Sequence, residues 1–379
     1  MNFQKITKSQ CVKLLSVLVL AIVSTIHLQA ADFTWTGAAD ANWSNPENWD
    51  GTENDYPRNT DKAIFAGDAG TFTQPFADSG IQSLTRVVFD VQSGGWTFGG
   101  TNELRLRGGS SFAGGVTTVN GPWRFDERTN FSIADGSVLL LNGNFNNAQR
   151  MNVRTGGTMV VSQDATQSTV DQEGLRIFDG STALLNINLV SNRTISESDY
   201  WVEHEGSTLG GTGGITFSET SRGLTIANGG RLSPGGNGTY GAQIGTFDVA
   251  TNNTAVTFAS GASLLIDLGA TAGDNDRVTV TASGSEGGYL DLTAGGAVLE
   301  LFGSVNQAVG DYTIATFNNP DNVAYGTFGT YLFNGDPLDS EFGFVSYYDE
   351  SIVFTVIPEP GTLLLLGVGG LLLLKRRRL

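Results

Sequence analysis

A short glycine-led pattern recurs along the chain, and its spacing limits the folds that the chain can adopt. One or two glycines are followed by a small residue and then by alternating apolar residues. Between Gly136 and Gly229 successive copies begin 20, 24, 26 and 23 residues apart, the length of one turn of a β-solenoid. The copies are GGWTF at Gly94, GGSSF at Gly108, DGSVLLL at Gly136, GGTMVV at Gly156, DGSTALL at Gly180, EGSTL at Gly206, NGGRL at Gly229, SGASLLI at Gly261 and GGAVLEL at Gly295.

Each copy predicts a tight turn followed by a short strand. Glycine, asparagine and aspartate tolerate the positive φ that a corner requires, and alternating Val, Leu and Ile suit a half-buried strand. Between Asp32 and Ile357 no stretch of sequence has the periodicity and caps of an amphipathic helix. The sequence therefore predicts an all-β body, a right-handed parallel β-helix or β-solenoid, with a β-sandwich or jelly roll as the alternative.

The first thirty residues have the order of a secretory signal peptide, in which a charged region, an apolar run and small residues follow one another. The apolar run is short for a membrane anchor, so we expect a signal helix that passes the Sec translocon and is cleaved at the small residues. In order along the chain, these features are Lys5, Lys8 and Lys13, the run Leu14–Ile26, and the cleavage residues Ala30 and Ala31.

The other end of the chain combines a Pro-Glu-Pro tripeptide, an apolar run and four cations. As a helix, the run at 361–374 would be about 21 Å long, against about 30 Å for a bilayer core. The prolines prevent this helix from extending upstream, and the positive-inside rule keeps the cations in the cytoplasm as stop-transfer charges. The tripeptide is Pro358, Glu359 and Pro360, and the cations are Lys375, Arg376, Arg377 and Arg378.

This tail resembles the PEP-CTERM sorting signal of Gram-negative bacteria over residues 357–379. The resemblance implies that exosortase recognises Pro358, Glu359 and Pro360 and cleaves near them. The protein would then pass from an inner-membrane intermediate to the cell surface or extracellular matrix. A plain tail anchor, whose prolines only end a helix, is the alternative.

A second resemblance concerns residues 205–330. The stretches LSPGGNGTYGAQIGTFDV at 232–249, SLLIDLG, and DNDRVTVT at 274–281 resemble the β-helical passengers of autotransporters and the autotransporter-associated β-strand repeats. Their shared features are turns and strands, so the resemblance implies a fold more than a function.

Together these observations predict five parts. They are a signal peptide at 1–30, an irregular Trp-rich cap segment at 31–93, solenoid repeats at 94–270, a C-terminal β region at 271–356 that is solenoid or sandwich-like, and the sorting signal at 357–379 with a single transmembrane helix at 361–374.

The body between the two ends is strongly acidic. Removing the three lysines of the start and the four cations of the tail leaves 14 of the 21 basic residues, whereas only Glu359 of the 38 acidic residues lies outside. The net charge of about −23 repels nucleic acid and anionic lipid, so phosphate-backbone binding is excluded. The single cysteine, Cys11, lies in the signal peptide, so disulfides do not hold the body together.

Catalytic motifs are scarce. His204 is the only histidine of the body, and in a strand its neighbours Glu203 and Glu205 would point to the opposite face, so we expect a surface histidine and no metal site or triad. The arginines at 150, 154 and 176 could supply the cations of a polysaccharide lyase, but no lyase motif surrounds them. We predict no catalytic residues and no cofactor.

Two weaker candidate sites would bind a ligand and would not catalyse a reaction. Asp274 and Asp276 offer oxygen ligands for Ca²⁺, but turn residues before a strand are the favoured interpretation because the spaced calcium pattern is absent. Trp35, Trp43 and Trp49 would either stack on sugar rings, if exposed, or cap the open end of the solenoid, if buried, and we expect the cap.

The sequence thus predicts an exported, non-enzymatic protein of the cell surface or extracellular matrix. It would act as a spacer or adhesin and associate with exopolysaccharide. The alternative is a polysaccharide-active enzyme, a lyase or glycosidase, on the same scaffold.

Overall fold

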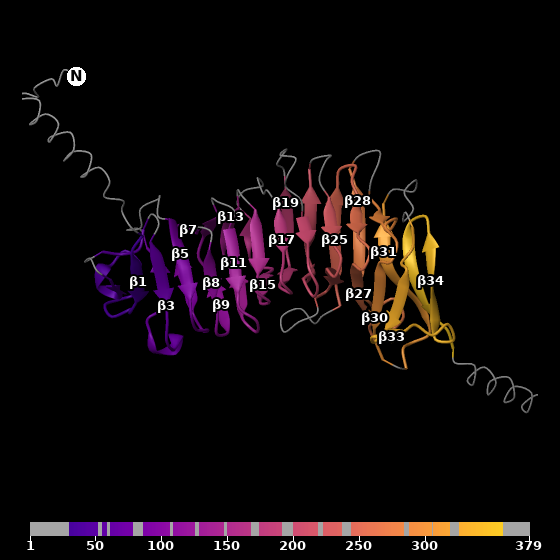
Figure 1. Ribbon diagram of the computed structural model, residues 1–379, viewed down its shortest axis with the longest axis horizontal. Helices are drawn as coiled ribbons and strands as arrows, with labels where there is room; N and C mark the ends of the chain where they lie inside the picture. The colour runs from indigo at the N-terminus through magenta and orange to yellow at the C-terminus, as the bar shows by residue number, and fades with distance from the viewer. Residues whose placement is uncertain are drawn as a thin grey trace, which may run out of the picture.

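The computed structural model describes an elongated all-β body in which the strands follow one another in chain order along the long axis (Figure 1). The only helices among the described residues are two short 3₁₀ turns, η1 (Pro46–Asn48) and η2 (Ala69–Thr71). The all-β prediction is confirmed. Residues 30–358 are described, except for 52–54, 59–60, 79–85, 107–108, 126–128, 148–149, 168–173, 192–199, 219–222, 237–243, 284–287, 305 and 319–325.

The strands within these ranges form three sheets, the largest of which has 16 strands. Its strand β5 pairs with both β7 and β8, which joins two ladders into one sheet. The members are β1 (Asp32–Trp35), β2 (Trp49–Asp50), β3 (Lys62–Phe65), β5 (Arg86–Val91), β7 (Leu104–Leu106), β8 (Ser110–Phe112), β10 (Trp123–Phe125), β11 (Thr129–Ile133), β13 (Asn144–Asn147), β14 (Met151–Arg154), β16 (Thr166–Gln167), β17 (Leu175–Ile177), β20 (Tyr200–Val202), β23 (Leu224–Ile226), β26 (Val256–Phe258) and β29 (Leu290–Asp291).

The second and third sheets have 12 and 7 described strands. The 12-stranded sheet contains β4 (Phe76–Ala77), β6 (Thr97–Gly100), β9 (Val116–Val119), β12 (Val138–Leu141), β15 (Thr158–Val161), β18 (Thr182–Leu185), β21 (Thr208–Gly211), β24 (Arg231–Pro234), β27 (Ser263–Asp267), β30 (Val298–Phe302), β32 (Thr330–Phe333) and β33 (Asp336–Pro337). The 7-stranded sheet contains β19 (Asn188–Ser191), β22 (Gly214–Phe217), β25 (Thr246–Thr251), β28 (Arg277–Ala282), β31 (Gly310–Phe317), β34 (Gly343–Tyr348) and β35 (Ser351–Val356).

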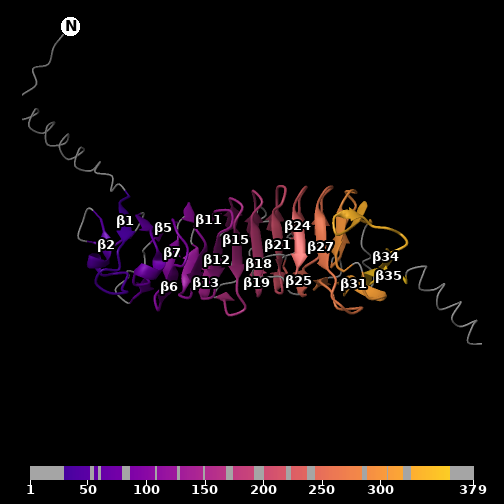
Figure 2. The same ribbon diagram turned by 90° about the horizontal axis from the view of Figure 1, so that it is seen from below.

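The chain visits the sheets in rotation. From β17 to β28, each strand pairs in parallel with the strand three places further on, so β18, β21, β24, β27 and β30 are consecutive neighbours. One turn of chain therefore supplies one strand to each of the three sheets. In the view turned by 90°, β15, β18, β21, β24 and β27 of the 12-stranded sheet follow one another along the long axis (Figure 2). These long parallel sheets are consistent with the predicted β-solenoid and unlike the antiparallel sheets of a β-sandwich. The hand of the coil stays a prediction.

Alternation along each strand builds the core. In β12, Leu139 and Leu141 are buried, and in β15 Met159 and Val161 occupy the same positions one turn later. Stacking like residues at a fixed register gives one continuous apolar interior, because each turn covers the exposed core of the turn before it. From Gly136 onward, the glycine-led copies found in the sequence form the corners that precede the strands of the 12-stranded sheet, beginning with β12.

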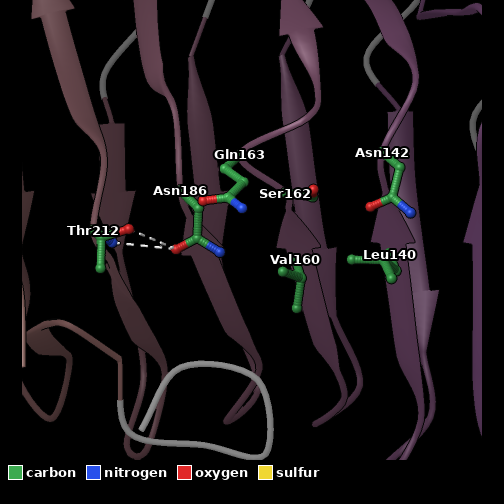
Figure 3. Close-up of a pocket in the computed structure, with 7 residues that line it drawn as sticks. All are labelled: Leu140, Asn142, Val160, Ser162, Gln163, Asn186 and Thr212. Atoms are coloured by element: carbon green, nitrogen blue, oxygen red, sulfur yellow. Dashed lines mark hydrogen bonds between the residues drawn. The ribbon is translucent and has the colours of Figure 1, made fainter. Parts of the chain in front are cut away.

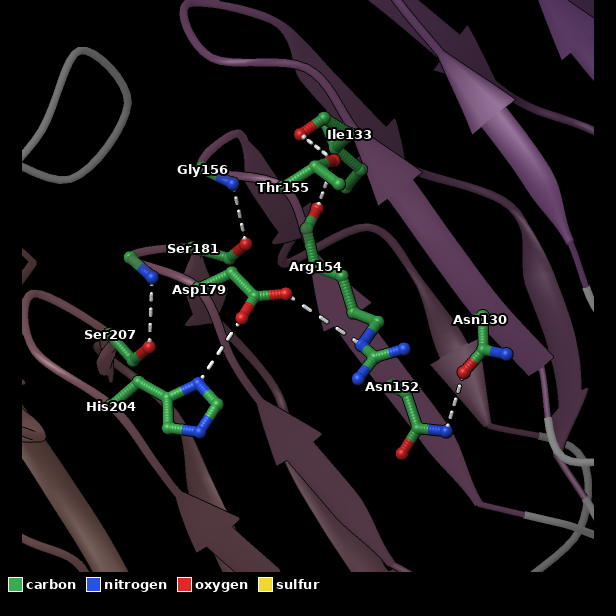
Figure 4. Close-up of polar contacts among 11 residues, drawn as sticks. Asn130, Ile133, Asn152, Arg154, Thr155, Gly156, Asp179, Ser181, His204 and Ser207 are labelled. Atoms are coloured by element: carbon green, nitrogen blue, oxygen red, sulfur yellow. Dashed lines mark hydrogen bonds and ion pairs between the residues drawn. The ribbon is translucent and has the colours of Figure 1, made fainter.

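The small residue after each of these corner glycines is buried. Ser181 accepts a hydrogen bond through its Oγ from the Gly156 N–H at 3.0 Å, and Ser207 accepts one from the Gly180 N–H at 3.1 Å (Figure 4). These hydroxyls satisfy backbone donors of the preceding turn, which explains the serine at three of the seven aligned positions. The aligned positions are Ser137, Gly157, Ser181, Ser207, Gly230, Ala262 and Ala297.

Parallel pairing begins earlier than residue 94, because β3 pairs in parallel with both β1 and β5. Trp35, Trp43 and Trp49 lie at this end and are 1%, 0% and 7% exposed. The Trp43 ring packs edge to face on Trp49 at 4.7 Å and stacks on Phe89 at 5.7 Å. The glycan-stacking alternative for these three residues is wrong in this structure, because their indoles fill the core of the first turns.

The other end of the body changes pairing mode. β31 pairs in parallel with β28 but antiparallel with β35, and β34 and β35 form an antiparallel hairpin. β32 similarly pairs in parallel with β30 and antiparallel with β33. The region 271–356 is thus a continuation of the parallel coil that closes with antiparallel strands.

Candidate functional site

A column of hydrogen-bonding side chains follows the outer face of the 16-stranded sheet. Asn152 lies between the buried residues Met151 and Val153, so it points outward, and strand register aligns it with Arg176 on the next turn. The column is Asn130, Asn152, Arg176, Trp201, Thr225 and Thr257, one residue from each of six consecutive turns.

Two arginines of this face lie over aromatic rings. The guanidinium carbon of Arg176 is 5.6 Å from the centre of the Trp201 ring, and that of Arg154 is 5.0 Å from the centre of the Phe178 ring. Such cation–π contacts hold the guanidinium planes against the sheet. Both arginines also form a long ion pair. In that of Arg176, Nη1 is 4.0 Å from Glu203 Oε1.

The ion pair of Arg154 involves a carboxylate that also contacts His204. Arg154 Nε is 3.8 Å from Asp179 Oδ2, and His204 Nδ1 is 3.2 Å from Asp179 Oδ1, so one carboxylate lies between a guanidinium and an imidazole (Figure 4). The expectation that His204 is a surface residue is confirmed, since its side chain is 58% exposed.

The sequence analysis placed His204 in a strand, and this prediction is wrong. The residue has a φ of 72° and lies in the corner after β20, beyond the end of the strand. Its partner is Asp179, in the equivalent corner one turn earlier, and not the adjacent glutamates. Asp179 itself has a φ of 55°, a conformation that aspartate tolerates better than most residues.

A shallow groove lies outside the 12-stranded sheet (Figure 3). Leu140 and Val160 form its apolar floor, and the cavity volume is about 320 Å³. Asn186 Oδ1 accepts hydrogen bonds from the backbone N–H and the hydroxyl of Thr212 at 3.2 and 3.3 Å, so this amide is engaged in linking two turns. The remaining lining residues are Asn142, Ser162 and Gln163.

Of the two aspartates considered as calcium ligands, Asp276 is held by backbone hydrogen bonds inside the fold. Asp276 is fully buried, its Oδ1 accepts from the Gly245 N–H at 2.8 Å, and its Oδ2 accepts from the Asp267 N–H at 3.2 Å. Asp274 is exposed in the turn before β28, as the turn interpretation predicts. Within the described ranges, no group of three or more His, Cys, Asp or Glu side chains could hold a metal ion.

Burial of Asp276 gives a testable pH dependence. Desolvation raises the pKa of this carboxyl to about 7, although its two backbone donors lower it. The folded state therefore binds the proton more tightly than the unfolded chain, so stability from this group is complete below about pH 4 and is lost as the pH rises to about 7. We expect thermal unfolding to show up to about 4 kcal/mol of this loss, and Asp276→Asn to flatten the profile. Asp274→Asn is the control that keeps the wild-type profile; an unchanged slope in Asp276→Asn would contradict the assignment.

The predicted termini lie mostly outside the described residues. Ala30 is exposed, and Ala31 donates its N–H to Asp61 Oδ1 at 3.0 Å. Pro358 is the last described residue, so Glu359, Pro360, the span 361–374 and the four cations, like the signal helix, lie beyond this range. In the part of the chain that is described, no helix has the length and apolar character needed to cross a bilayer.

Comparison with known families identifies the tail. Residues 356–378 match the PEP-CTERM protein-sorting motif. No curated protein matches the chain. The motif indicates that the protein is exported, sorted by exosortase, and placed at the surface or in the extracellular space. The predicted sorting signal is confirmed at its predicted place.

The sequence points to the arginines of the outer face but not to their surroundings. Arg154 and Arg176 are candidates from sequence only as lyase cations, and Arg150 precedes β14. Sequence reasoning misses Asn152, Asp179 and Trp201. Aligning the three-residue strands MNV, LRI, YWV, LTI and VTF would have found the column, since each has one polar or aromatic residue between two apolar ones.

Proposed function

We propose that the protein is a non-enzymatic structural or adhesive component of the cell surface or extracellular matrix of a Gram-negative bacterium, associated with exopolysaccharide. The observation that carries this proposal is the joining of a sorting motif to a long, parallel all-β body. Between β4 and β32 the 12-stranded sheet extends for about 50 Å at about 4.8 Å per strand, a suitable length for a spacer. We also propose that its turns are related to autotransporter-associated β-strand repeats.

The sorting step is tested by replacing Pro358, Glu359 and Pro360 together with alanine. We expect the native protein to lose the mass of its tail and to reach the surface or medium, whereas the variant stays full-length in the inner membrane. Intact mass spectrometry and cell fractionation measure both. The double change Asp336→Ala/Pro337→Ala in the exposed strand β33 is the matched control and is processed normally. If the triple variant is processed like the native protein, exosortase does not act on this tripeptide.

A polysaccharide lyase or glycosidase is the second candidate, favoured by the Arg154, Asp179 and His204 cluster. Incubation with acidic and neutral polysaccharides separates the two proposals. A structural protein produces neither new reducing ends nor unsaturated-uronate absorbance. Release of product that disappears in Asp179→Asn would favour the enzyme.

A further inference from the structure

The first described residues show where this end of the chain becomes attached to the sheet. Ala30 is exposed, whereas Ala31 is partly buried and packs against the core. Two hydrogen bonds join Ala31 to the beginning of β3: its N–H donates to Asp61 Oδ1 at 3.0 Å, and its carbonyl accepts from the Lys62 N–H at 2.8 Å. Asp32 then begins β1, which pairs in parallel with β3 (Figure 1). The contacts between this end of the chain and the sheet therefore start at Ala31.

The sequence allows signal cleavage at two bonds, because Ala30 and Ala31 are both small residues that precede the first acidic residue. Hydrolysis after Ala31 would remove a residue whose N–H and C=O both bind the neighbouring strand, and Asp61 Oδ1 would lose this donor. Hydrolysis after Ala30 removes only an exposed residue from the body and keeps both hydrogen bonds. The structure therefore favours the bond between Ala30 and Ala31.

Hydrolysis of this bond changes the group that faces Asp61. Water adds across the C–N bond, which leaves a carboxylate on Ala30 and an amine on Ala31. This amine takes up a proton near neutral pH, because an α-amino group has an ordinary pKa of about 7.7–8.0. The nitrogen that lies 3.0 Å from Asp61 Oδ1 thus changes from a neutral amide to an ammonium, and its hydrogen bond to the carboxylate gains the attraction of opposite charges.

The Asp61 carboxylate is already oriented for an ammonium at this place. Its Oδ2 accepts from the Arg58 N–H at 2.9 Å, and the Asp61 N–H donates to the Arg58 carbonyl at 3.2 Å. These two hydrogen bonds hold both the backbone and the side chain of Asp61, and they leave Oδ1 for Ala31. The ammonium therefore meets a carboxylate that needs no rearrangement.

We propose that signal peptidase cuts between Ala30 and Ala31 and that the Asp61 carboxylate binds the new α-ammonium as an ion pair. Chain ends open readily unless they are tied down, and this pair fastens the free end of β1 to β3. β3 in turn pairs with β5, so the mature terminus is joined to the first turns of the solenoid. The inference goes beyond the proposed function, because it concerns how the exported body is completed and applies equally to a structural protein and to an enzyme.

The cleaved bond is identified on protein that is expressed with its own signal peptide and purified after export. Intact mass spectrometry and N-terminal sequencing are expected to show Ala31 as the first residue. A mature chain that begins at Asp32, or at any residue other than Ala31, overturns the proposal.

The ion pair is measured by titrating the α-amine. Lys62 is the only lysine between Ala31 and the tail, so reductive methylation with ¹³C-formaldehyde labels the α-amine, Lys62 and, where the tail is kept, Lys375. The NMR signal of each labelled amine then follows its own protonation. We expect the pKa of the α-amine to be higher in the folded protein than in the same protein unfolded in urea, because the adjacent carboxylate favours the charged form.

Variants assign this effect to Asp61, since Asp32 and Lys62 also carry charges near the amine. Asp61→Asn should weaken proton binding by the α-amine by about threefold or more. Asp61→Ser keeps an acceptor for the Arg58 N–H and gives the same comparison if the first variant does not fold. Asp50→Asn is the charge-matched control, because Asp50 is exposed on β2, and it should change proton binding by less than about twofold.

A loss of proton affinity that is confined to the Asp61 variants supports the ion pair. Equal proton affinity in wild type and in the folded Asp61 variant, or an equal loss in Asp50→Asn, overturns it even where Ala31 is the first residue. Melting temperatures show which variants are folded.

Discussion

Replacing Trp43 by alanine is expected to destabilise the first turns by about 3–5 kcal/mol, the cost of deleting a fully buried large aromatic side chain. The ring contacts Trp49, Phe65 and Phe89, so its loss opens a cavity between the capping strands and the second turn. Because each turn of a solenoid is stabilised mainly by its neighbours, unfolding should begin at this end and appear as an earlier denaturation transition.

Phe344→Ala is the matched control for Trp43→Ala. Phe344 is 49% exposed, so its removal should change the free energy of unfolding by less than about 0.5 kcal/mol. Denaturant titration followed by tryptophan fluorescence and circular dichroism compares the two variants. Unchanged stability in Trp43→Ala would show that the indole does not close the core.

Gly214→Ala should also be strongly destabilising, for a different reason. A Cβ at Gly214 would lie 2.0 Å from the carbonyl oxygen of Asp248 on the adjacent strand β25. The backbone has nowhere to move without breaking the β22–β25 ladder, so we expect a loss of about 3 kcal/mol or more. The glycine is in extended conformation, which alanine also adopts, so the cost comes from the clash alone.

Gly295→Ala separates this clash from backbone strain. Gly295 has a φ of 68°, and a methyl group added there would meet no heavy atom within 4 Å, so alanine should cost only about 1–2 kcal/mol for the left-handed conformation. Thermal unfolding of both variants gives the comparison. Equal losses would mean that the two turns are not as closely packed as their register indicates.

The sequence contained enough information for the repeating part of the fold. Alternation in stretches such as SVLLL places Leu139 and Leu141 inside, and the glycine before it places the corner. These are local properties, repeated often enough to fix the length of a turn. The tail was equally predictable, because a tripeptide, an apolar run and a cation cluster in fixed order are all read within 23 residues.

The site was much less predictable. Asp179 and His204 are 25 residues apart, and they meet because the corner after β17 stacks under the corner after β20. Turn lengths vary, so a shift of one residue in the assumed register would have moved Asp179 to another face. Trp201 similarly stands out only because Arg176 lies beside it on the preceding turn, and the parallel register alone makes these two residues neighbours.

The rotation of the chain through three sheets has a mechanical consequence. Backbone hydrogen bonds between turns run along the long axis, so a pull between the two ends loads one interturn ladder at a time instead of shearing all of them together. Each released turn of about 24 residues would add about 80 Å of extended chain. A tethered molecule of this kind would yield under tension in steps, lengthening by whole turns while the remaining coil keeps its shape.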